Sequence, residues 1–237
     1  MPNTTSTAAT NAPLTIIHIH DDWVIVNKPA GISMQQEQGQ PDEPSLLQYA
    51  LAEVQKVERR ITKLWPVHRL DKVTSGLVIF ARNAQAAASF TPMFSQQEVQ
   101  KYYIALALGK PKKKQGWVKG DMEKGRNGSW LLTRNTTNPA ITQFNSCALI
   151  TSENEAKRLY LIKPKTGKTH QIRVALKSIA CPILGDERYK GAQADRCYLH
   201  ALNLSFIWKK QTFSFNALPE QGCWPELSSI ELLSEFF

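Results

Sequence analysis

Short apolar runs with the composition of β-strands recur along this chain, and few helical segments separate them. Strands that come in runs, instead of alternating regularly with helices, favour an α+β fold over a doubly wound α/β fold. The expected strands are residues 14–20, 23–27, 77–81, 99–108, 141–150, 157–163, 197–206 and 211–217. The expected helices are residues 45–57, residues 84–90 and a segment capped by Thr169, and residues 110–128 are expected to form a basic loop or a hairpin.

No internal repeat and no linker divides the sequence into separate units. The first residues are rich in Thr, Asn and Ala, a composition that is typical of a disordered tail. The rest is long enough to bury one ample core. We therefore expect a disordered tail at residues 1–12 and one domain at residues 13–237.

The segment at 68–76 reads HRLDKVTSG and directly precedes the apolar run LVIFA. A polar cluster before a buried strand is typical of a loop that carries function on a rigid scaffold. Asp71 is a usable nucleophile only when it is ionised, and burial disfavours the ionised form, so a buried reactive Asp71 needs a cation nearby. Arg69 could pair with Asp71 or reach outward to a ligand. These residues alone also leave open a solvated or purely structural Asp71.

A second polar segment, KPKTGKTHQIRV at 163–174, supplies further cations. Thr169 is the expected N-cap of a helix whose apolar stripe ends before Pro182. His170 and Arg173 are three residues apart, so they can share one face of that helix. Positive charge at a helix N-terminus opposes the macrodipole, which favours an anionic partner over a purely solvated basic helix start.

Both segments resemble signatures of the RluA-type pseudouridine synthases. The first matches the pattern HRLD-x-x-TSG at every specified position, and the second resembles the motif TGRTHQIR. The segment DDWVIVNKPAG at 21–31 resembles the family's NKPAG segment, and KYYIALALG at 101–109 resembles its K-x-Y motif. Residues 182–186 and 199–201 match later family positions, so the similarity spans about residues 14–220 in the family's order.

The resemblance implies an isomerase that converts uridine in structured RNA, either rRNA or tRNA, to pseudouridine after flipping the base into its pocket. By the family's motifs, Asp71 is the nucleophile, which attacks C1′ of the ribose or C6 of the base. Arg173 forms the ion pair that keeps Asp71 ionised, and Tyr103 stacks on the flipped uracil. The implied fold is one domain with a mixed, largely antiparallel sheet and a central cleft. Further RNA contacts are expected at Arg69, which takes the place of the flipped base, and at His68, Thr74, Lys101, Lys168, His170 and Gln171.

Positive charge is concentrated in two stretches of the chain. The net charge is +9, which favours a polyanionic partner, although a solubilising surface is the alternative. Residues 110–126 hold seven basic and two acidic residues, and residues 156–177 hold seven basic and none acidic. Clusters of this kind contact phosphates, which fix the position of RNA without reading its sequence.

Several classes of protein are disfavoured by the sequence. Cys147, Cys181, Cys197 and Cys223 show no metal-site spacing, and the proposed chemistry needs no metal or cofactor. The start of the chain does not resemble a signal peptide, and no apolar run approaches the ~20 residues that span a bilayer. We expect a cytoplasmic monomer without an S4 RNA-binding domain, with no DNA or membrane partner.

Two other kinds of function compete with the isomerase. One is a non-catalytic RNA-binding or RNA-folding protein on the same scaffold, which the presence of Asp71, Tyr103 and Arg173 disfavours. The other is a glycoside hydrolase, which needs a second Asp or Glu as general acid. No motif offers such a carboxylate beside Asp71.

Overall fold

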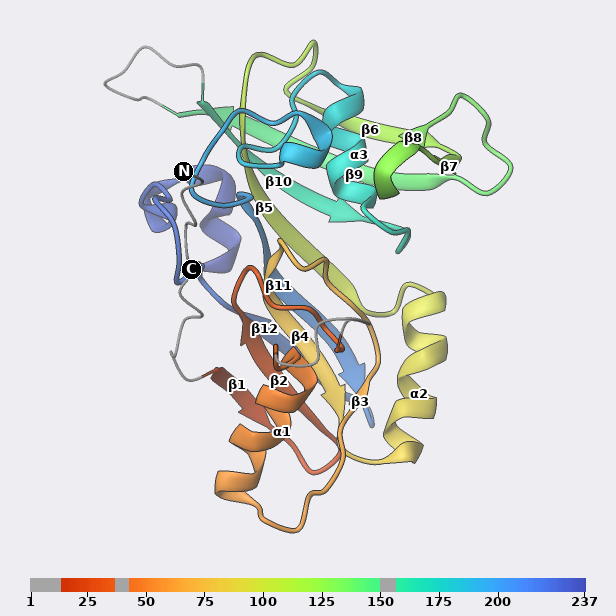
Figure 1. The fold of residues 1–237 in the computed structure, drawn as a ribbon, viewed down its shortest axis with the longest axis vertical. Coiled ribbons are helices and arrows are strands. Elements are labelled where there is room, and N and C mark those ends of the chain that lie inside the picture. The colour runs from red at the N-terminus through yellow and green to blue at the C-terminus, as the bar shows by residue number, and fades with distance from the viewer. Residues whose placement is uncertain (1–13, 37–42, 150–156) are drawn as a thin grey trace, which may run out of the picture.

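The computed structural model describes residues 14–36, 43–149 and 157–237, so the predicted tail lies outside the described residues (Figure 1). Twelve strands form within these ranges: β1 Thr15–Ile19, β2 Trp23–Lys28, β3 Trp65–Pro66, β4 Ser75–Ala81, β5 Gln100–Leu108, β6 Gln115–Gly120, β7 Met122–Lys124, β8 Trp130–Leu132, β9 Ala140–Ala148, β10 Lys157–Pro164, β11 Leu199–Trp208 and β12 Gln211–Asn216. The helices are α1 Leu46–Val57, α2 Ala84–Ser95 and α3 Gln171–Ser178, with short 3-10 turns at Arg126–Gly128, Glu187–Tyr189, Leu227–Ser229 and Glu231–Phe236.

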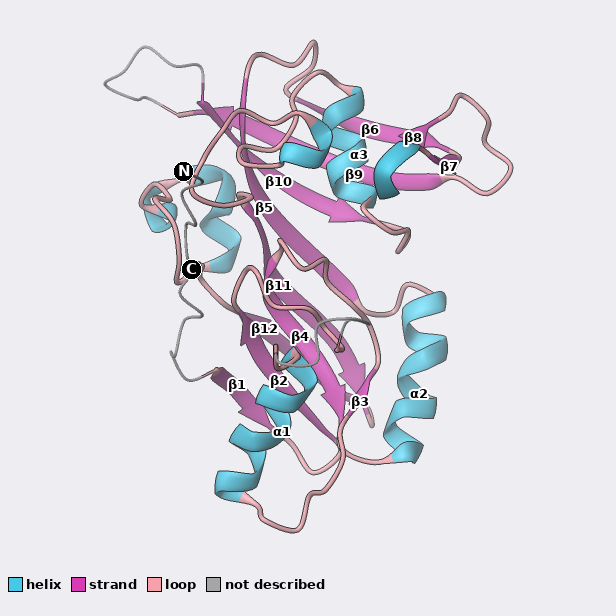
Figure 2. Cartoon of the chain, in the orientation of Figure 1, coloured by secondary structure: helices cyan, strands magenta, loops and turns pink. Residues whose placement is uncertain are grey.

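One sheet runs through the whole molecule, in the order β1-β2-β4-β11-β5-β10-β9-β6 (Figure 2). Strand β12 pairs with β11, strand β3 pairs with β4, and β7 and β8 form a separate hairpin. In the described ranges every strand pair is antiparallel except β4–β11, which is parallel. The predicted α+β class with a mixed, largely antiparallel sheet is confirmed.

The central strands are apolar on both faces, and each face has its own core. In β2, Val24 and Val26 face one core and Trp23 and Ile25 face the other, because successive side chains of a strand point to opposite sides. Helix α1 packs on the first face through Leu46, Ala50 and Val54, whereas α2 covers the second through Ala86, Phe90 and Met93. Burial on both faces explains the unbroken apolar runs in the sequence.

The ends of α1 and α2 follow from local hydrogen bonds. Ser45 and Gln48 form a reciprocal capping box at the start of α1, where the sequence predicts the helix. Asn83 accepts a hydrogen bond from the backbone of Ala86 at 2.7 Å and so caps α2 as predicted. Helix α2 continues past the predicted end at Phe90, because Met93 packs into the same core in the final turn.

Two predictions about local structure are wrong. The N-cap of α3 is His170, in a left-handed conformation with φ of 56°, and Thr169 does not cap the helix. Residues 110–128 form neither a plain loop nor a hairpin closed on itself. They contain β6, which extends the main sheet beside β9, and β7, whose partner β8 follows a 3-10 turn. Strand β6 lies at the edge of the sheet, and its buried and exposed residues alternate in its second half. The many lysines around it make this pattern hard to recognise in the sequence.

The two halves of the molecule meet where β11 lies between β4 and β5 (Figure 1). The lower half contains β1 to β4, α1 and α2, and the upper half contains β6 to β10 and α3. Gly76, with φ of +114°, pairs with Ala201 of β11, and a Cβ at Gly76 would lie 2.4 Å from the backbone nitrogen of Ala201. Only glycine permits this approach, which holds the loop before β4 at the junction of the two halves.

Candidate active site

The loop that carries Asp71 is held by hydrogen bonds from a buried lysine. The Nζ atom of Lys28 donates to the carbonyl oxygens of Pro29 at 3.0 Å, Lys72 at 3.1 Å and Thr74 at 2.8 Å. Burial lowers the pKa of Lys28 to about 7, an effect that the negative charge of Asp71 partly opposes. The backbone N–H of Thr74 also donates to the carbonyl of Asp71 at 3.0 Å. The backbone from Asp71 to Thr74 is therefore fixed by hydrogen bonds.

Arg173 joins the carboxylates of Asp71 and Asp186. Its Nη1 donates to Oδ2 of Asp71 at 3.2 Å, and its Nε and Nη2 donate to the two oxygens of Asp186 at 2.7 and 2.8 Å. The side chains of Arg173 and Asp186 are 4% and 1% exposed, whereas that of Asp71 is 17% exposed. Burial alone would lower the pKa of Arg173, but the two carboxylates, Asp186 foremost, raise it above its ordinary value. A permanent cation thus lies against the more accessible carboxylate.

His170 lies near the same oxygen of Asp71 that Arg173 contacts, and Tyr189 in turn contacts His170. The Nε2 atom of His170 is 4.0 Å from Oδ2 of Asp71, and its Nδ1 is 2.8 Å from the hydroxyl of Tyr189. That hydroxyl also accepts the backbone N–H of Trp130 in β8 at 3.0 Å. The Arg173 guanidinium carbon lies 5.0 Å from the centre of the Tyr189 ring, within the range of a cation–π contact. Tyr189 therefore touches both residues that flank Asp71.

A pocket of about 100 Å³ opens beside Asp71, at the junction of the two halves. Eight of the predicted site residues line it together with Asp71: Arg69, Thr74, Lys101, Tyr103, Lys168, His170, Gln171 and Arg173. An open hollow of about 1000 Å³ lies elsewhere, against the 3-10 turns near the C-terminus, and none of the predicted site residues lines it. Its carboxylates at Glu226, Glu231 and Glu235 make it unsuited to a polyanion.

Tyr103 and Lys101 reach the pocket from β5, two residues apart on one face of the strand. Tyr103 is 8% exposed. Burial, and secondarily the charge of Asp71, raises its pKa above the ordinary value, so the phenol stays protonated at neutral pH. Burial lowers the pKa of Lys101, whose Nζ lies 5.5 Å from the centre of the Phe94 ring. The pocket thus has an aromatic ring and a cation on one wall.

Arg69 is exposed at the mouth of the pocket, while Arg173 takes the position beside Asp71. Of the two roles that the sequence left open for Arg69, the structure therefore favours an outward one. Lys168 is half-buried, and its Nζ donates to the Asn138 side chain at 2.8 Å. Both cations lie where they can meet a ligand.

Two predicted RNA contacts have structural partners instead. The side chain of Gln171 makes four hydrogen bonds, accepting from Thr166 and Lys168 and donating to Ile141 and Thr142. Because all its polar atoms are used and the residue is 5% exposed, we remove Gln171 from the expected RNA contacts.

His68 is the second such residue. Its Nε2 accepts the backbone N–H of Ile79 at 2.9 Å, and its ring stacks on Phe94 with 4.8 Å between ring centres. Burial and then the charge of Lys101 lower its pKa to about 3, so the ring is neutral. His68 holds the loop onto β4 and is not among the residues that line the pocket.

Sequence reasoning gave no role to Lys28, Asp186 or Tyr189, although all three support Asp71. Lys28 lies within the NKPAG segment, and a lysine inside a fully buried strand is a signal of a specific partner. Asp186 follows Gly185, whose φ of +75° marks a tight turn. Nothing in the local sequence indicates the hydroxyl contact of Tyr189.

Residues 22–178 match the family described as RNA pseudouridylate synthase. The chain belongs to this family. The family that the motifs indicated is thereby confirmed, and its members are isomerases. An "Uncharacterized RNA pseudouridine synthase" of Haemophilus influenzae is 45% identical over 212 residues, which are 87% of this chain and 88% of that protein. The "Dual-specificity RNA pseudouridine synthase RluA" of Pasteurella multocida is 32% identical over 90% of this chain and 96% of its own length.

Solved structures of similar fold include "Human RNA Pseudouridylate Synthase Domain Containing 4". Its superposition on this pseudouridine synthase has a TM-score of 0.71 and a sequence identity of 23%. The superposed region covers 87% of this chain and 89% of the human chain. This likeness shows the fold. In the described part of the chain, no helix has the length and apolar character required to cross a membrane.

Proposed function

We propose that this pseudouridine synthase isomerises uridine in structured RNA with Asp71 as its nucleophile. The observation that carries the proposal is the 3.2 Å ion pair between Asp71 and Arg173, two residues 102 positions apart in the chain. A carboxylate beside a permanent, buried cation stays ionised in a poorly solvated pocket and can attack carbon. Attack at C1′ displaces the base from the ribose, whereas attack at C6 gives an adduct of the base. In either case the N1–C1′ bond breaks, a C5–C1′ bond forms, the bond to Asp71 is released, and C5 loses its proton while N1 gains one.

The pocket supports a flipped base as the reacting group. A base stacked in a helix hides its glycosidic bond, so the nucleotide must leave the stack to reach Asp71. The Tyr103 ring offers a surface for stacking on the uracil, and the guanidinium of Arg69 is placed to fill the space that the base leaves. The pocket of about 100 Å³ is smaller than the roughly 300–1,000 Å³ of pockets for drug-sized ligands, which favours a small occupant such as one base.

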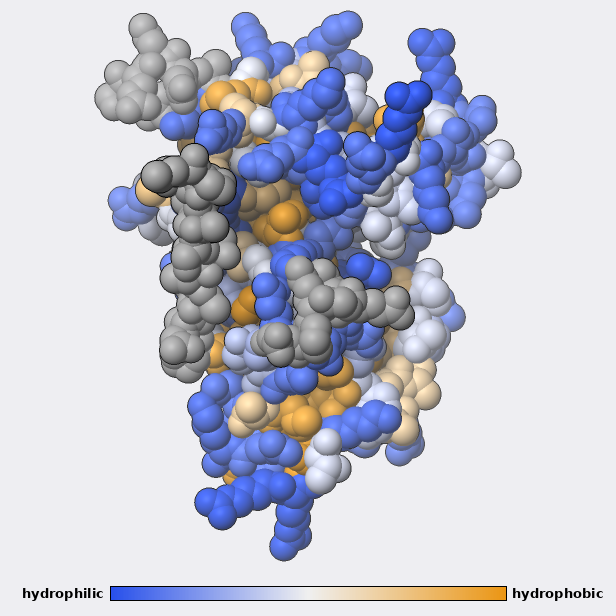
Figure 3. Space-filling view, in the orientation of Figure 1, coloured by the Kyte–Doolittle hydropathy of each residue, from blue (hydrophilic) through white to orange (hydrophobic). Residues whose placement is uncertain are grey.

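We propose that cations in the pocket and on the surface of the upper half supply the contacts to phosphates. Lys168 lines the pocket, and the exposed residues Lys112 to Lys114 belong to the basic stretch before β6. Figure 3 shows hydrophilic residues over most of the upper half of the molecule. Phosphate contacts do not select a sequence, so both rRNA and tRNA remain proposed substrates. We also propose that the active protein is a cytoplasmic monomer.

The test is incubation of the purified protein with rRNA and tRNA transcripts that carry labelled uridine, followed by nucleoside analysis. Pseudouridine is the expected product, and it should be absent with the Asp71→Asn variant. Release of free uracil would indicate a hydrolase, and RNA binding without either product would indicate a silent RNA-binding protein. Mapping of pseudouridine in total RNA from cells with and without the gene then identifies the modified position.

A further inference from the structure

Tyr189 occupies a position that determines which nitrogen of His170 carries the proton. The tyrosine is 5% exposed, so its hydroxyl must find its partners within the protein. One lone pair of the hydroxyl oxygen accepts the N–H of Trp130 at 3.0 Å. In the described residues the remaining neighbour of the hydroxyl is Nδ1 of His170, at 2.8 Å. If the hydroxyl hydrogen is to have a partner within the protein, that partner is Nδ1, which is then unprotonated.

We propose that Tyr189 is a positioning residue that holds His170 as the neutral tautomer with its proton on Nε2, and that this N–H is directed at the Asp71 carboxylate. A neutral imidazole accepts at one nitrogen and donates at the other. With Nδ1 occupied by the Tyr189 hydroxyl, the donor is Nε2, which lies 4.0 Å from Oδ2 of Asp71. That distance is long for a hydrogen bond, and contacts of this kind tighten when the substrate fills a site.

The surroundings of His170 support a neutral ring. Burial lowers its pKa, and the charges of Arg173 and Arg188 act in the same direction, while Asp71 and Asp186 oppose them. A neutral donor at Nε2 would add a second hydrogen bond to the ionised form of Asp71 without adding a charge that competes with Arg173. The left-handed backbone at His170 is uncommon for a residue other than glycine, and the ring lies between Tyr189 and Asp71.

The role in turnover rests on the proposed nucleophile, but the tautomer does not. In Tyr189→Phe the ring of His170 loses the donor at Nδ1, so both neutral tautomers become available. In the Nδ1-protonated form, the lone pair of Nε2 faces the carboxylate of Asp71 and the hydrogen bond is lost. Loss of one hydrogen bond to a charged group typically corresponds to a change of about ten- to hundred-fold.

The deciding measurement is a long-range ¹H–¹⁵N correlation spectrum of the RNA-free protein, which distinguishes protonated from unprotonated ring nitrogens. The His170→Gln variant assigns the signals of His170. In the wild type we expect an unprotonated Nδ1 and a protonated Nε2, and in Tyr189→Phe a mixture of both tautomers. A wild-type ring protonated at Nδ1, or a tautomer unchanged by Tyr189→Phe, would overturn the inference.

Kinetics provide a second readout. Tyr189→Phe should lower the turnover number about ten- to hundred-fold with the KM for RNA near its wild-type value. His170→Gln, which keeps an N–H near the position of Nε2, should be more active than His170→Leu, and equal losses would count against the proposal. Tyr198→Phe is the matched control. The Tyr198 hydroxyl also accepts a backbone N–H, from Cys223, and donates to a side chain, Asp195, but away from Asp71.

The control variant should keep wild-type turnover, so a general effect of removing a buried hydroxyl can be recognised. If the wild-type protein formed no pseudouridine, the proposed function would fail, and the ring spectrum would still decide the state of His170.

Discussion

Residues 14–99 carry eight Lys and Arg and nine Asp and Glu, whereas residues 100–190 carry eighteen and six. The first region supplies the proposed nucleophile, on a loop whose carbonyl oxygens accept hydrogen bonds from Lys28 of β2. The second region supplies Arg173 and most of the cations that can meet RNA. The difference indicates that the reacting anion and the groups that bind the polyanion are placed on separate parts of the chain. The cation in direct contact with Asp71 is the buried guanidinium of Arg173, from the second region.

The sharpest test of this division is the removal of the nucleophile alone. Asp71→Asn keeps the shape of the side chain but removes the anion, so pseudouridine formation should fall by roughly 10³-fold or more. RNA affinity should stay near the wild-type value, because the cations of residues 100–190 are intact. Filter binding and nucleoside analysis measure the two quantities side by side. Residual turnover of more than a few per cent would assign the chemistry to another residue.

The ion pair across the two regions gives the next largest effect. Arg173→Met leaves two carboxylates without their buried cation, which typically costs about 3–5 kcal/mol in the free energy of unfolding. Turnover at neutral pH should fall by at least about 10²-fold, because a carboxylate without its counter-ion is driven towards its protonated form. Arg173→Lys should restore only part of the activity, since an ammonium lacks the planar fork. A fully active Arg173→Met protein would show that this cation has no part in the reaction.

Asp186 belongs to the same region as Arg173, and its substitution should lower turnover less than substitution of the arginine. Asp186→Asn loosens the bidentate hold on the guanidinium but leaves Asp71 with its cation, so we expect a loss of about ten-fold in turnover. The melting temperature and the steady-state rate are measured together, with Asp195→Asn as the control acid. A loss as large as that of Arg173→Met would mean that Asp186 acts directly on the reacting groups.

The contrast in surface charge predicts different salt dependence for the two regions. Reversal of Lys112, Lys113 and Lys114 to Glu should weaken RNA binding and flatten the log–log slope of affinity against salt, by about 0.7 for each lost single-strand phosphate contact. The same reversal at Arg59, Arg60 and Lys63 in the first region is the matched control and should change the slope less. Equal slopes for the two triple variants would refute a path for RNA over the basic loop.

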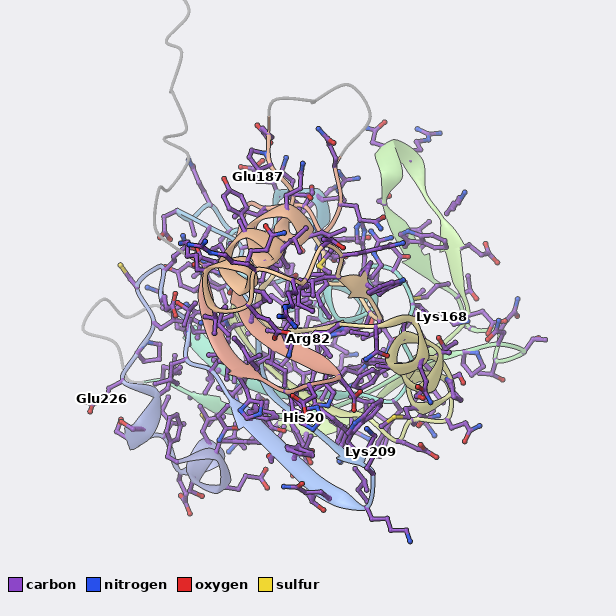
Figure 4. The ribbon with its side chains drawn as sticks, turned by 90° about the horizontal axis from the view of Figure 1, so that it is seen from below. His20, Arg82, Lys168, Glu187, Lys209 and Glu226 are labelled. Atoms are coloured by element: carbon purple, nitrogen blue, oxygen red, sulfur yellow. The ribbon has the colours of Figure 1, made fainter. Side chains whose placement is uncertain are left out.

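The smallest effect is expected at the far end of the first region, where the contacts are purely structural. Asp22 accepts hydrogen bonds from Lys209, Trp208 and Asn83, and Figure 4 shows Lys209 near His20 and Arg82 at this end. The hydrogen bond from Lys209 is the main cause that lowers the pKa of Asp22 to about 2. Because this pKa is depressed, the stabilisation is present above about pH 4 and is lost as the pH falls through about 2.

Asp22→Asn should therefore lower the free energy of unfolding by about 1–2 kcal/mol at neutral pH, and by less as the pH approaches 2. Urea titrations of both proteins at several pH values measure the difference. Turnover at neutral pH should not change, and a change would connect this end of the molecule to the site.

The features that sequence could predict are those whose causes are local. The capping box at Ser45 and the cap at Asn83 lie within a few residues of the helices they start, so both helices were predicted at their N-termini. The start of α3 was missed because His170 adopts its left-handed backbone in a tertiary setting, with its ring held by Tyr189. Strand β6 was missed because its pairing with β9 is not encoded in its own composition.

The same distinction applies to the site. Asp71, Tyr103 and Arg173 stand in motifs, so a resemblance to a family could point to them. The pairing of Arg173 with Asp186, the contact of Tyr189 with His170 and the internal use of Gln171 are set by distances between segments. Those distances depend on how the sheet brings β4, β5 and α3 together, which no local pattern specifies.

The place of β11 in the sheet has a consequence for protein synthesis. A growing chain that has reached Arg173 already contains Asp71, Tyr103 and the arginine, yet the strand that lies between β4 and β5 begins only at Leu199. Until that strand leaves the ribosome and enters the gap, the two sides of the site have no fixed separation. We therefore expect that the nascent enzyme cannot modify RNA until β11 has been synthesised and has paired with β4 and β5.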